Sequence, residues 1–473
     1  MHDVQTMEVA ARGRGPVVQN WTMTFASRLG EWRSAGGSLA QSLARAVQNA
    51  VLDGQIPVGS PMPSERALAR DMDVSRGTVV AGLALLRDAG WIETRHGSGS
   101  VVRLPPQLTT RTTPWSLDHA AGDIEFDLTQ AVTAAPYQTY LAAARRAVDR
   151  SATLLVDAGT ATAGLPQLRG LLAERYTQQG LATTPSQILI TSGAMSALTL
   201  LVDHLCDRRR PMLVESPTYP GALASLRRSG APLVSLPVDA EGWRRVANLI
   251  RSSRANLAYL TPDFHNPTGA LMPGDVRRQV GAHGDRHDVT VVVDETMRDL
   301  DLRTPPAAIP HVAGPRVITI GSTSKVIWSG LRVGWIRASS ALIRELLLNP
   351  LHARLSSPPL EQLIAHDLLG DLDEIVCERR TQLRTQRDHL VNLLDGNDAW
   401  SYTVPLGGLT MWLQLHNTTG IALAAQARRR GLALTPGPQF SVDRTLTNYL
   451  RVPFTATPEV LTRAIGLLTS PPT

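Results

Sequence analysis

The chain contains a single lysine, Lys325, in the run Gly321–Lys325 (Gly-Ser-Thr-Ser-Lys). The other 46 of its 47 Lys and Arg side chains are arginines. An arginine stays protonated and cannot condense with a carbonyl, whereas a desolvated lysine amine can. A single retained lysine therefore predicts a Schiff-base site for an aldehyde cofactor. The alternative is an arginine-biased composition that left one lysine by chance.

An arginine and two serines near this lysine, and a carboxylate earlier in the chain, suit a phosphorylated pyridine ring. Asp294 ends an apolar run, where a carboxylate either caps a strand or pairs with a protonated pyridine nitrogen. Arg332 follows Lys325 by seven residues and can bind a phosphate dianion together with the hydroxyls of Ser322 and Ser324. These residue types together indicate an aldehyde cofactor that also carries a phosphate.

Further segments could complete such a site. Thr191–Met195 lies before a helix expected to start near Ser196, and the free amides of a helix N-terminus suit a phosphate, although ordinary strand–helix turns look the same. Tyr219 follows the next strand, and its ring would either stack in the cleft or pack in the core. Asn266 lies after a third strand. Arg451 can grip a carboxylate with two hydrogen bonds, or be one of many surface arginines.

Apolar runs alternate with helical segments in residues 125–473. This alternation predicts a mostly parallel sheet with helices on both faces, an α/β fold whose site forms at the carboxyl ends of the strands. The predicted strands include 188–190, 212–214, 257–260, 289–293 and 317–320. Several of the polar residues above follow these strands directly, so we expect them at one edge of the sheet.

Three helices and a hairpin are predicted in residues 38–103. Apolar residues recur at helical spacing, and Ser64 and Ser75 are the expected N-caps of the second and third helices. Two short apolar pairs around the turn 96–99 predict a β-hairpin. This is a winged helix-turn-helix (α+β), with Ser75–Thr78 opening the recognition helix and offering hydroxyls and amides to DNA phosphates. A small helical adaptor domain is the alternative.

Length and composition bound the class of protein. A chain of 473 residues is expected to hold two or three units, here an N-terminal extension (1–37), the winged helix (38–103), a Pro- and Thr-rich linker (104–124) and the α/β domain (125–473). A net charge of +6 permits a polyanionic partner. We expect a cytoplasmic protein, because there is no secretory signal, no apolar run of about 20 residues for a membrane span, and no metal-ligand spacing around the two cysteines.

The N-terminal motifs resemble GntR-type DNA-binding domains. The likeness rests on 63–69 (Pro-Ser-Glu-Arg-Ala-Leu-Ala), 74–79 (Val-Ser-Arg-Gly-Thr-Val) and 95–99 (Arg-His-Gly-Ser-Gly). It implies that double-stranded DNA is contacted by Arg66, Ser75, Arg76, Gly77, Thr78, His96 and Gly97. Val80 departs from the pattern, since relatives often carry a further basic contact there, so base preference is expected to differ.

From about Asp127 to the C-terminus the chain resembles fold type I aminotransferases, which bind pyridoxal 5'-phosphate (PLP). The resemblance implies that Lys325 and Asp294 carry the chemistry, Lys325 as the Schiff-base lysine and Asp294 as the pyridinium partner. It also implies amide donors to the phosphate (Gly193, Ala194, Met195), further phosphate ligands (Ser322, Ser324, Arg332), a stacked ring (Tyr219), a hydrogen bond to the ring hydroxyl (Asn266) and an effector carboxylate clamp (Arg451).

Three departures from that family concern hydroxyl groups around the cofactor. Relatives commonly place a tyrosine two or three residues after the aspartate, where this chain has Thr296 and Met297. Residues 158–164 lack the tyrosine that often reaches the partner subunit's cofactor, and Met195-Ser196 replaces a more polar pair. Losing hydroxyls should leave PLP capture intact and weaken the tuning of proton transfer.

With the two resemblances in one chain, residues 38–473 resemble the MocR/GabR-type transcriptional regulators. They imply a homodimer that reads paired half-sites and senses PLP, an amino compound or both, in vitamin B6 or amino-acid metabolism. One alternative is an active aminotransferase with a DNA-tethering domain. Another is an inert dimerisation domain in which Lys325 stays unmodified.

Overall fold

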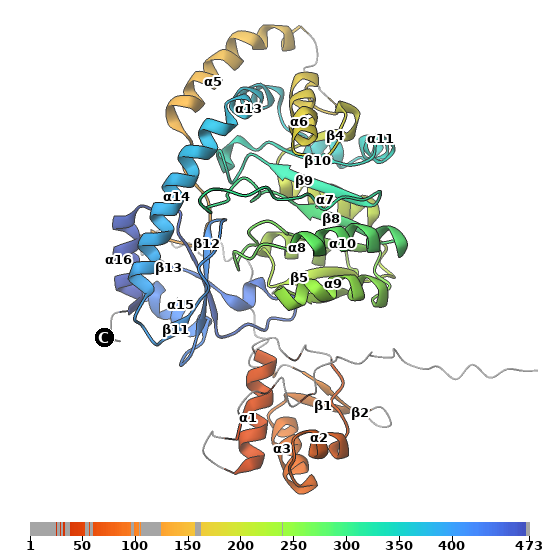
Figure 1. Ribbon diagram of the computed structural model, residues 1–473, viewed down its shortest axis with the longest axis vertical. Coiled ribbons are helices and arrows are strands. Elements are labelled where there is room, and N and C mark those ends of the chain that lie inside the picture. Colours follow the sequence, from red (N-terminus) through yellow and green to blue (C-terminus); the bar gives the residue numbers. More distant parts are fainter. Residues whose placement is uncertain are drawn as a thin grey trace, which may run out of the picture. The chain divides into compact units, whose positions relative to one another are not determined.

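The computed structural model describes residues 25, 29, 32–33, 38–52, 56, 60–95, 99–103, 105, 124–156, 162–238 and 240–469. The chain divides into two compact units, residues 1–110 and 111–473 (Figure 1). Most of the predicted linker lies outside the described residues. Among those described, no helix combines the length and apolar character that crossing a membrane requires.

Unit 1 is the predicted winged helix-turn-helix. Its elements are α1 (Leu39–Leu52), α2 (Glu65–Asp71), α3 (Arg76–Asp88) and an antiparallel hairpin of β1 (Ile92–Arg95) and β2 (Gly99–Val102). The predicted caps are present, since the Ser64 hydroxyl accepts from the Ala67 amide and the Ser75 hydroxyl accepts from the Thr78 amide. A side-chain cap replaces a hydrogen bond that the first helical turn cannot make, which fixes where α2 and α3 begin.

The core of unit 1 brings all three helices and the hairpin together. Val47, Leu68, Leu86 and Val102 are each at most 1% exposed within one apolar cluster. Trp32, which precedes the predicted start of the domain at residue 38, also packs into this cluster.

Unit 2 contains the predicted, mostly parallel sheet. Seven strands lie in the order β4-β10-β9-β8-β7-β5-β6, and β10 alone runs antiparallel to its neighbours. The strands are β4 (Ile188–Thr191), β5 (Met212–Ser216), β6 (Leu233–Pro237), β7 (Leu257–Leu260), β8 (Thr290–Asp294), β9 (Val317–Ser322) and β10 (Gly334–Arg337). The sequence predicted five of these and missed β6 and β10.

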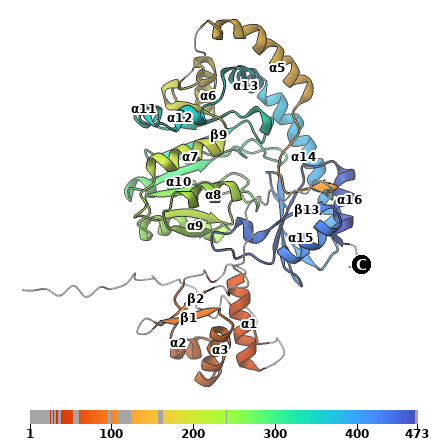
Figure 2. The same ribbon diagram turned by 180° about the vertical axis from the view of Figure 1, so that it is seen from behind.

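Helices cover both faces of this sheet (Figures 1 and 2). One face packs against α7 (Ala194–Leu205), α8 (Pro220–Arg228) and α11 (Ser340–Leu348), and the other against α9 (Ala240–Ser252) and α10 (Gly274–Arg286). Neighbouring residues of one strand enter opposite clusters, as Tyr259 and Leu260 do, because successive side chains of a strand alternate between faces. Both faces are apolar, so the strands read as continuous apolar runs.

A second, smaller sheet near the C-terminus was not predicted. Its antiparallel order is β11-β12-β15-β14, and the long helix α14 reaches from the large sheet to this one in both views. The remaining elements are β3 (Phe126–Asp127), α5 (Tyr137–Arg150), η2 (Ser151–Leu154), α6 (Pro166–Gln178), η3 (Pro185–Gln187), η4 (Ser329–Leu331), α12 (His352–Leu355), α13 (Pro359–Gly370), α14 (Leu372–Leu394), β11 (Trp400–Ser401), β12 (Thr410–Leu415), α15 (Gly420–Arg429), β13 (Leu432–Ala433), β14 (Thr435–Pro436), η5 (Gly437–Phe440), β15 (Tyr449–Pro453) and α16 (Pro458–Thr469).

Candidate functional site

Lys325 lies at the carboxyl edge of the large sheet, three residues after β9 ends. Its amine donates to the Ala131 carbonyl at 3.0 Å, and the Thr133 hydroxyl donates to the Lys325 carbonyl at 3.2 Å. Burial, and then the charge of Arg451, lower the pKa of the amine to about 8, while Asp294 acts in the opposite direction. A much larger fraction of this amine is neutral near physiological pH than of an ordinary lysine. The neutral amine is the form that attacks a carbonyl.

Asp294 is the last residue of β8, the strand beside β9. The Tyr259 hydroxyl donates to its Oδ2 at 2.7 Å, and the Thr296 amide donates to its Oδ1 at 3.0 Å. Burial raises the pKa of the Asp294 carboxyl, and these two hydrogen bonds and the Lys325 charge lower it. Tyr259 was not predicted as a site residue, because in the sequence it is one more apolar position in a buried strand.

Gly193, Ala194 and Arg332 form one cradle beside this edge. Gly193, at φ 110°, is the N-cap of α7, so the helix begins at Ala194 and not near Ser196 as predicted. A Cβ on Gly193 would lie 3.7 Å from the Arg332 guanidinium, and one on Gly334 would lie 2.8 Å from the Ala194 nitrogen. The amides of Ala194 and Met195 belong to the first turn of α7, where N–H groups have no partner within the helix. Free amides beside a guanidinium suit a phosphate.

Two serines and a left-handed backbone complete the cradle. Ser322 and Ser324 share a hydrogen bond of 2.7 Å between their hydroxyls. Arg332 has φ 54°, a conformation that costs a non-glycine residue about 1 kcal/mol or more. Its carbonyl accepts from the Ser357 hydroxyl at 3.1 Å, which helps to hold this backbone.

Tyr219 interacts electrostatically with Asp294, Arg332 and Arg451. Burial and the Asp294 charge raise the pKa of its hydroxyl, against the charges of Arg451 and Arg332. Its ring lies against Gly221, where a Cβ would meet the ring at 2.5 Å. The structure therefore brings Tyr219 together with Asp294, Arg332 and Arg451.

Asn266 carries an orphaned polar atom. It lies in the loop after β7, before a cis proline, and is 7% exposed. Its Oδ1 has no hydrogen-bond partner within the described part of the chain. An unpartnered buried amide is costly, and a ligand hydroxyl would satisfy it.

Arg451 is a buried arginine on β15, which excludes the surface alternative. Its guanidinium donates to the Thr129 carbonyl and lies 5.0 Å from the Phe440 ring centroid. Its Nε has no partner among the residues described, and burial lowers its pKa to about 10. The hydrogen-bond acceptors of this cation are a carbonyl and the Thr435 hydroxyl, so it retains the capacity to bind a carboxylate.

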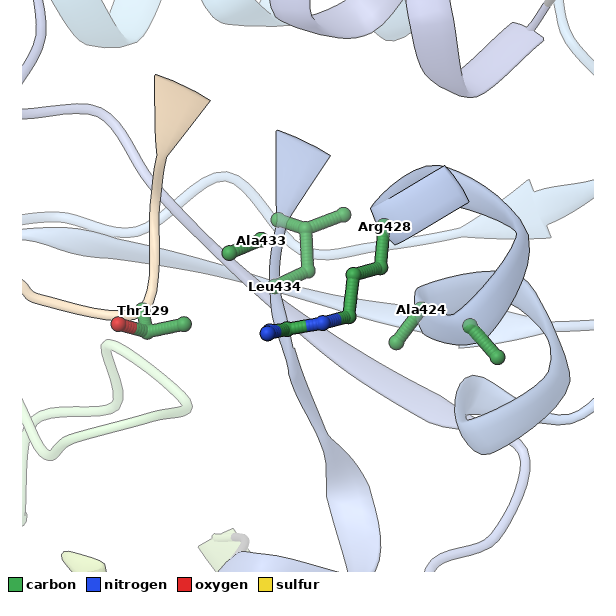
Figure 3. A pocket seen from close by; sticks show the side chains of 6 residues that line it. Thr129, Ala424, Arg428, Ala433 and Leu434 are labelled. Carbon is green, nitrogen blue, oxygen red and sulfur yellow. The ribbon is translucent and has the colours of Figure 1, made fainter. Parts of the chain in front are cut away.

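A pocket of about 150 Å³ opens beside Thr129. Figure 3 shows Thr129 and Arg428 on opposite sides of it, with Leu434 between them. It contains none of the predicted cofactor residues, and touches the site only through the residue whose carbonyl binds Arg451.

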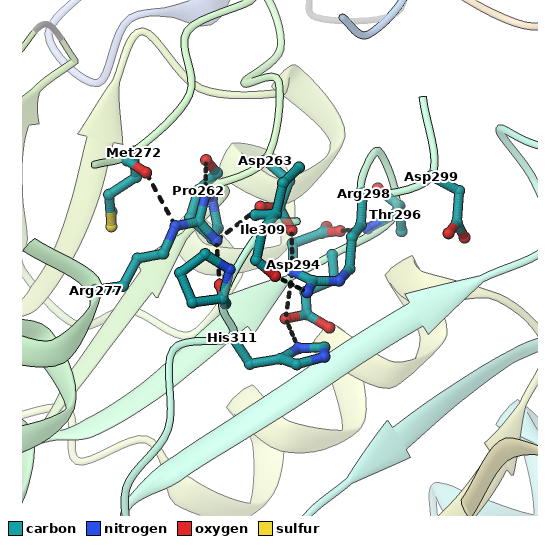
Figure 4. Close-up of polar contacts among 12 residues, drawn as sticks. Pro262, Asp263, Met272, Arg277, Asp294, Thr296, Arg298, Asp299, Ile309 and His311 are labelled. Atoms are coloured by element: carbon teal, nitrogen blue, oxygen red, sulfur yellow. Dashed lines mark hydrogen bonds and ion pairs between the residues drawn. The ribbon is translucent and has the colours of Figure 1, made fainter. Parts of the chain in front are cut away.

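Buried ionisable side chains form a network of polar contacts beside Asp294 (Figure 4). Arg277 pairs with Asp263 at 2.7 Å, and Arg298 lies 3.4 Å from the other Asp263 oxygen. Glu295, which follows Asp294, contacts the His311 ring nitrogen at 2.6 Å. These contacts fix the turn that carries Asp294. Met297 is 3% exposed and packs in the apolar core.

The predicted DNA contacts of unit 1 lie around the start of α3. Ser75, Arg76 and Gly77 are exposed, and Arg66 is exposed on α2. Arg76 pairs with Glu65 at 2.9 Å, and such an exposed pair is weak enough to yield to a phosphate. Thr78 shares a hydrogen bond with Ser75. His96 and Gly97 lie outside the described residues, as do 158–161 of the segment that lacks a tyrosine.

Comparison with known proteins matches both units. The model for aminotransferase class I and II matches residues 127–468, and that for bacterial regulatory proteins of the gntR family matches 39–102. The HTH-type transcriptional regulator YisV of Bacillus subtilis is 27% identical over 449 residues, 86% of this chain and 91% of that protein. The probable rhizopine catabolism regulatory protein MocR of Rhizobium meliloti is 29% identical over 64% of this chain and 66% of that one. Among solved structures, the α-aminoadipate aminotransferase LysN of Thermus thermophilus, complexed with N-(5'-phosphopyridoxyl)-L-leucine, matches with TM-score 0.67 and 27% identity over 72% of this chain and 90% of that one.

Proposed function

This chain belongs to the class I and II aminotransferase family and carries a GntR-type DNA-binding domain, and we propose that it is a transcriptional regulator that senses PLP, alone or joined to an amino compound, through Lys325. The observation that carries the proposal is the sole lysine, largely removed from solvent and acted on by the charge of Asp294, in a chain that also carries a GntR-type winged helix. Relatives that match over most of the chain carry the name of HTH-type transcriptional regulators.

The side chains of unit 2 suit PLP. The cofactor supplies an aldehyde that condenses with a neutral amine and a pyridine ring that withdraws electrons. Asp294 would hold the pyridinium, Tyr219 would stack on the ring, and Asn266 would satisfy its orphaned amide at the ring hydroxyl. The phosphate would be held by Gly193, Ala194, Met195, Ser322, Ser324 and Arg332.

The segment after β3 links this site to the DNA-binding domain along the chain. The Lys325 amine is bound by the Ala131 carbonyl and the Arg451 guanidinium by the Thr129 carbonyl. Covalent capture at Lys325 and a carboxylate on Arg451 would withdraw both donors from this segment. Ligand state would then change the segment directly after the linker, provided that the ligand prefers one of the two arrangements.

A homodimer belongs to this proposal. Among the described residues, Tyr137, Val148, Leu155 and Val156 on α5 and the turn after it are 57–83% exposed. Such a group of apolar side chains is typical of an interaction surface. Two copies would present two winged helices to paired half-sites. Light scattering of the purified protein tests this, and a monomer at working concentration removes it.

An active aminotransferase is the second candidate, favoured by the likeness to LysN and by a lysine and an aspartate, Lys325 and Asp294, at one edge of the sheet. Thr296 and Met297 stand against it, since relatives commonly have a tyrosine at one of these two positions, and Met297 is packed in the core. A single half-reaction with an amino acid is compatible with a sensor. Sustained turnover of an amino acid with a keto acid would instead establish the enzyme.

The deciding experiment is fluorescence anisotropy on DNA from the gene's own upstream region at one fixed salt concentration. PLP is titrated with the parent protein and with Lys325→Ala. A PLP-dependent change in affinity that the variant lacks supports the sensor. Affinity and footprint unchanged by PLP and by candidate amines would refute it.

Borohydride reduction followed by peptide mass analysis checks the covalent step separately. Because the chain has one lysine, a pyridoxyl group on any lysine peptide identifies Lys325 without ambiguity. Lys325→Ala is the matched control, and an equal adduct in that variant would show that the label is non-specific.

A further inference from the structure

The amino edge of the large sheet, opposite the edge that carries Lys325, holds a group of arginines. Arg210 precedes β5, Arg254 precedes β7 and Arg316 precedes β9. In the sheet order β9-β8-β7-β5-β6 these strands are close neighbours. Their starts therefore place the three arginines along one edge.

Direct contacts join these arginines into one surface. The Arg210 guanidinium donates to the carbonyls of Arg254 at 3.2 Å and Ala255 at 2.8 Å. Arg210 and Arg316 both pair with Asp288, which precedes β8. Two cations thus share one carboxylate.

The surface extends over the helices that end at this edge. A Cβ on Gly230, before β6, would lie 4.0 Å from the Arg208 side chain, and Arg228 ends α8. Arg251 in α9 and Arg286 in α10 both act electrostatically on His283. We call this surface the basic edge, and it comprises Arg208, Arg209, Arg210, Arg228, Arg251, Arg254, Arg286 and Arg316.

Positive charge is in excess there. The same turns and helix ends hold four carboxylates, namely Asp203, Asp207, Asp285 and Asp288, and Glu345 of α11 lies 3.3 Å from His204 beside them. Arg208, Arg209 and Arg228 are exposed and form no ion pair within the described residues. A cation at a helix C-terminus also favours the helix dipole, which accounts for Arg228 but not for Arg208 and Arg209 in the turn before β5.

We propose that the basic edge binds the phosphate backbone of duplex DNA flanking the operator that the winged helix reads. The proposal rests on the proposed function, because the winged helix of the same chain would hold DNA at high local concentration. Five adjacent strands span about 19 Å at about 4.8 Å each, the length of roughly six base pairs at 3.4 Å per step. Guanidinium groups suit phosphates through paired hydrogen bonds.

The test uses the full-length protein and two duplexes, one holding the operator alone and one extended by about two helical turns on each side. Arg208→Gln/Arg209→Gln is the test variant. Arg278→Gln/Arg429→Gln is the matched control, since it also removes two exposed arginines, and Arg278 lies toward the opposite end of α10 from Arg286. Thermal melting first checks that both variants fold like the parent.

On the extended duplex, the slope of log affinity against log salt should be smaller by about 1.8 in the test variant, because each lost phosphate contact removes about 0.9. Parent and control should share the steeper slope, and all three proteins should bind the short operator alike. Equal slopes for test and control variants, or no gain from the flanks in the parent, would overturn the basic edge. Failure of all three to bind the short operator would instead count against the proposed function.

Discussion

Replacing Lys325 with methionine should stabilise unit 2 in the absence of PLP while abolishing covalent capture. Burial and the charge of Arg451 together lower the pKa of the amine from 10.5 to about 8, and each pKa unit corresponds to about 1.4 kcal/mol, so carrying this charge in the folded state costs about 3 kcal/mol below pH 8. Methionine leaves the Ala131 carbonyl without its donor, a loss of about 1 kcal/mol. The free energy of unfolding should therefore rise by about 2 kcal/mol at pH 7.

The sign of the pH dependence follows from the depressed pKa. The parent is least stable below pH 8, where the buried amine is charged, and it recovers between pH 8 and 10.5, where the amine is neutral in the folded state alone. The advantage of Lys325→Met should shrink across that window. Calorimetry of the PLP-free proteins from pH 7 to 10 measures it, with an expected gain at pH 7 of about 3 °C in the transition of unit 2.

PLP capture gives a second measure of the same pKa. At pH 7 about one amine in ten is neutral at a pKa of about 8, compared with roughly one in 3,000 for an ordinary lysine. The capture rate of the parent should rise about fivefold from pH 7 to 8 and then level off, whereas a lysine peptide used as control should keep rising. A variant no more stable than the parent at pH 7, or a capture rate still rising tenfold per unit at pH 9, would refute a desolvated Lys325.

Three further changes test other parts of the molecule. Tyr259→Phe removes a hydrogen bond that lowers the pKa of Asp294, so the carboxyl pairs less well with a pyridinium. PLP should then bind about tenfold more weakly in a fluorescence titration. Unchanged affinity would assign Tyr259 to packing. Arg277→Met leaves Asp263 buried with a weaker partner, and unit 2 should lose about 3 kcal/mol or more of stability on denaturant unfolding; a loss below about 1 kcal/mol would contradict a tightly coupled pair. Ser75→Ala removes the N-cap of α3 and should lower the stability of unit 1 by about 1 kcal/mol in calorimetry, with PLP affinity intact; an unaltered unit 1 transition would show that water replaces the cap.

The winged helix was predictable because its signals are local. Ser64 and Ser75 accept hydrogen bonds from amides three residues away, so residue type and spacing alone place the starts of α2 and α3. The start of α7 was predicted two residues late, because its N-cap gives no side-chain signal. Gly193 caps that helix through its positive φ and has no side chain to announce it.

Non-local partners of the site were beyond the sequence. Asp294 and Lys325 could be placed because residues at strand ends meet at one edge of a parallel sheet. Tyr259 lies 35 residues from Asp294 in the chain, and its pattern is that of any buried strand. The carbonyls of Thr129 and Ala131 carry no side-chain signature at all. The small sheet was missed because two of its four strands have only two residues each, too few to show alternation.

The residues present in the proposed site concern PLP binding, whereas the tyrosine that is missing concerns turnover. Lys325, Asp294 and Arg332 supply an amine, a buried carboxylate and a guanidinium, all of which would hold PLP in the proposed site. Relatives commonly place a tyrosine two or three residues after the aspartate, where this chain has Thr296 and Met297, and Met297 is packed in the apolar core. Placing a tyrosine ring there would overpack a buried site. Under the proposed roles, a site that retains Lys325, Asp294 and Arg332 but packs Met297 in the core favours a domain that reports on a ligand over one that consumes it.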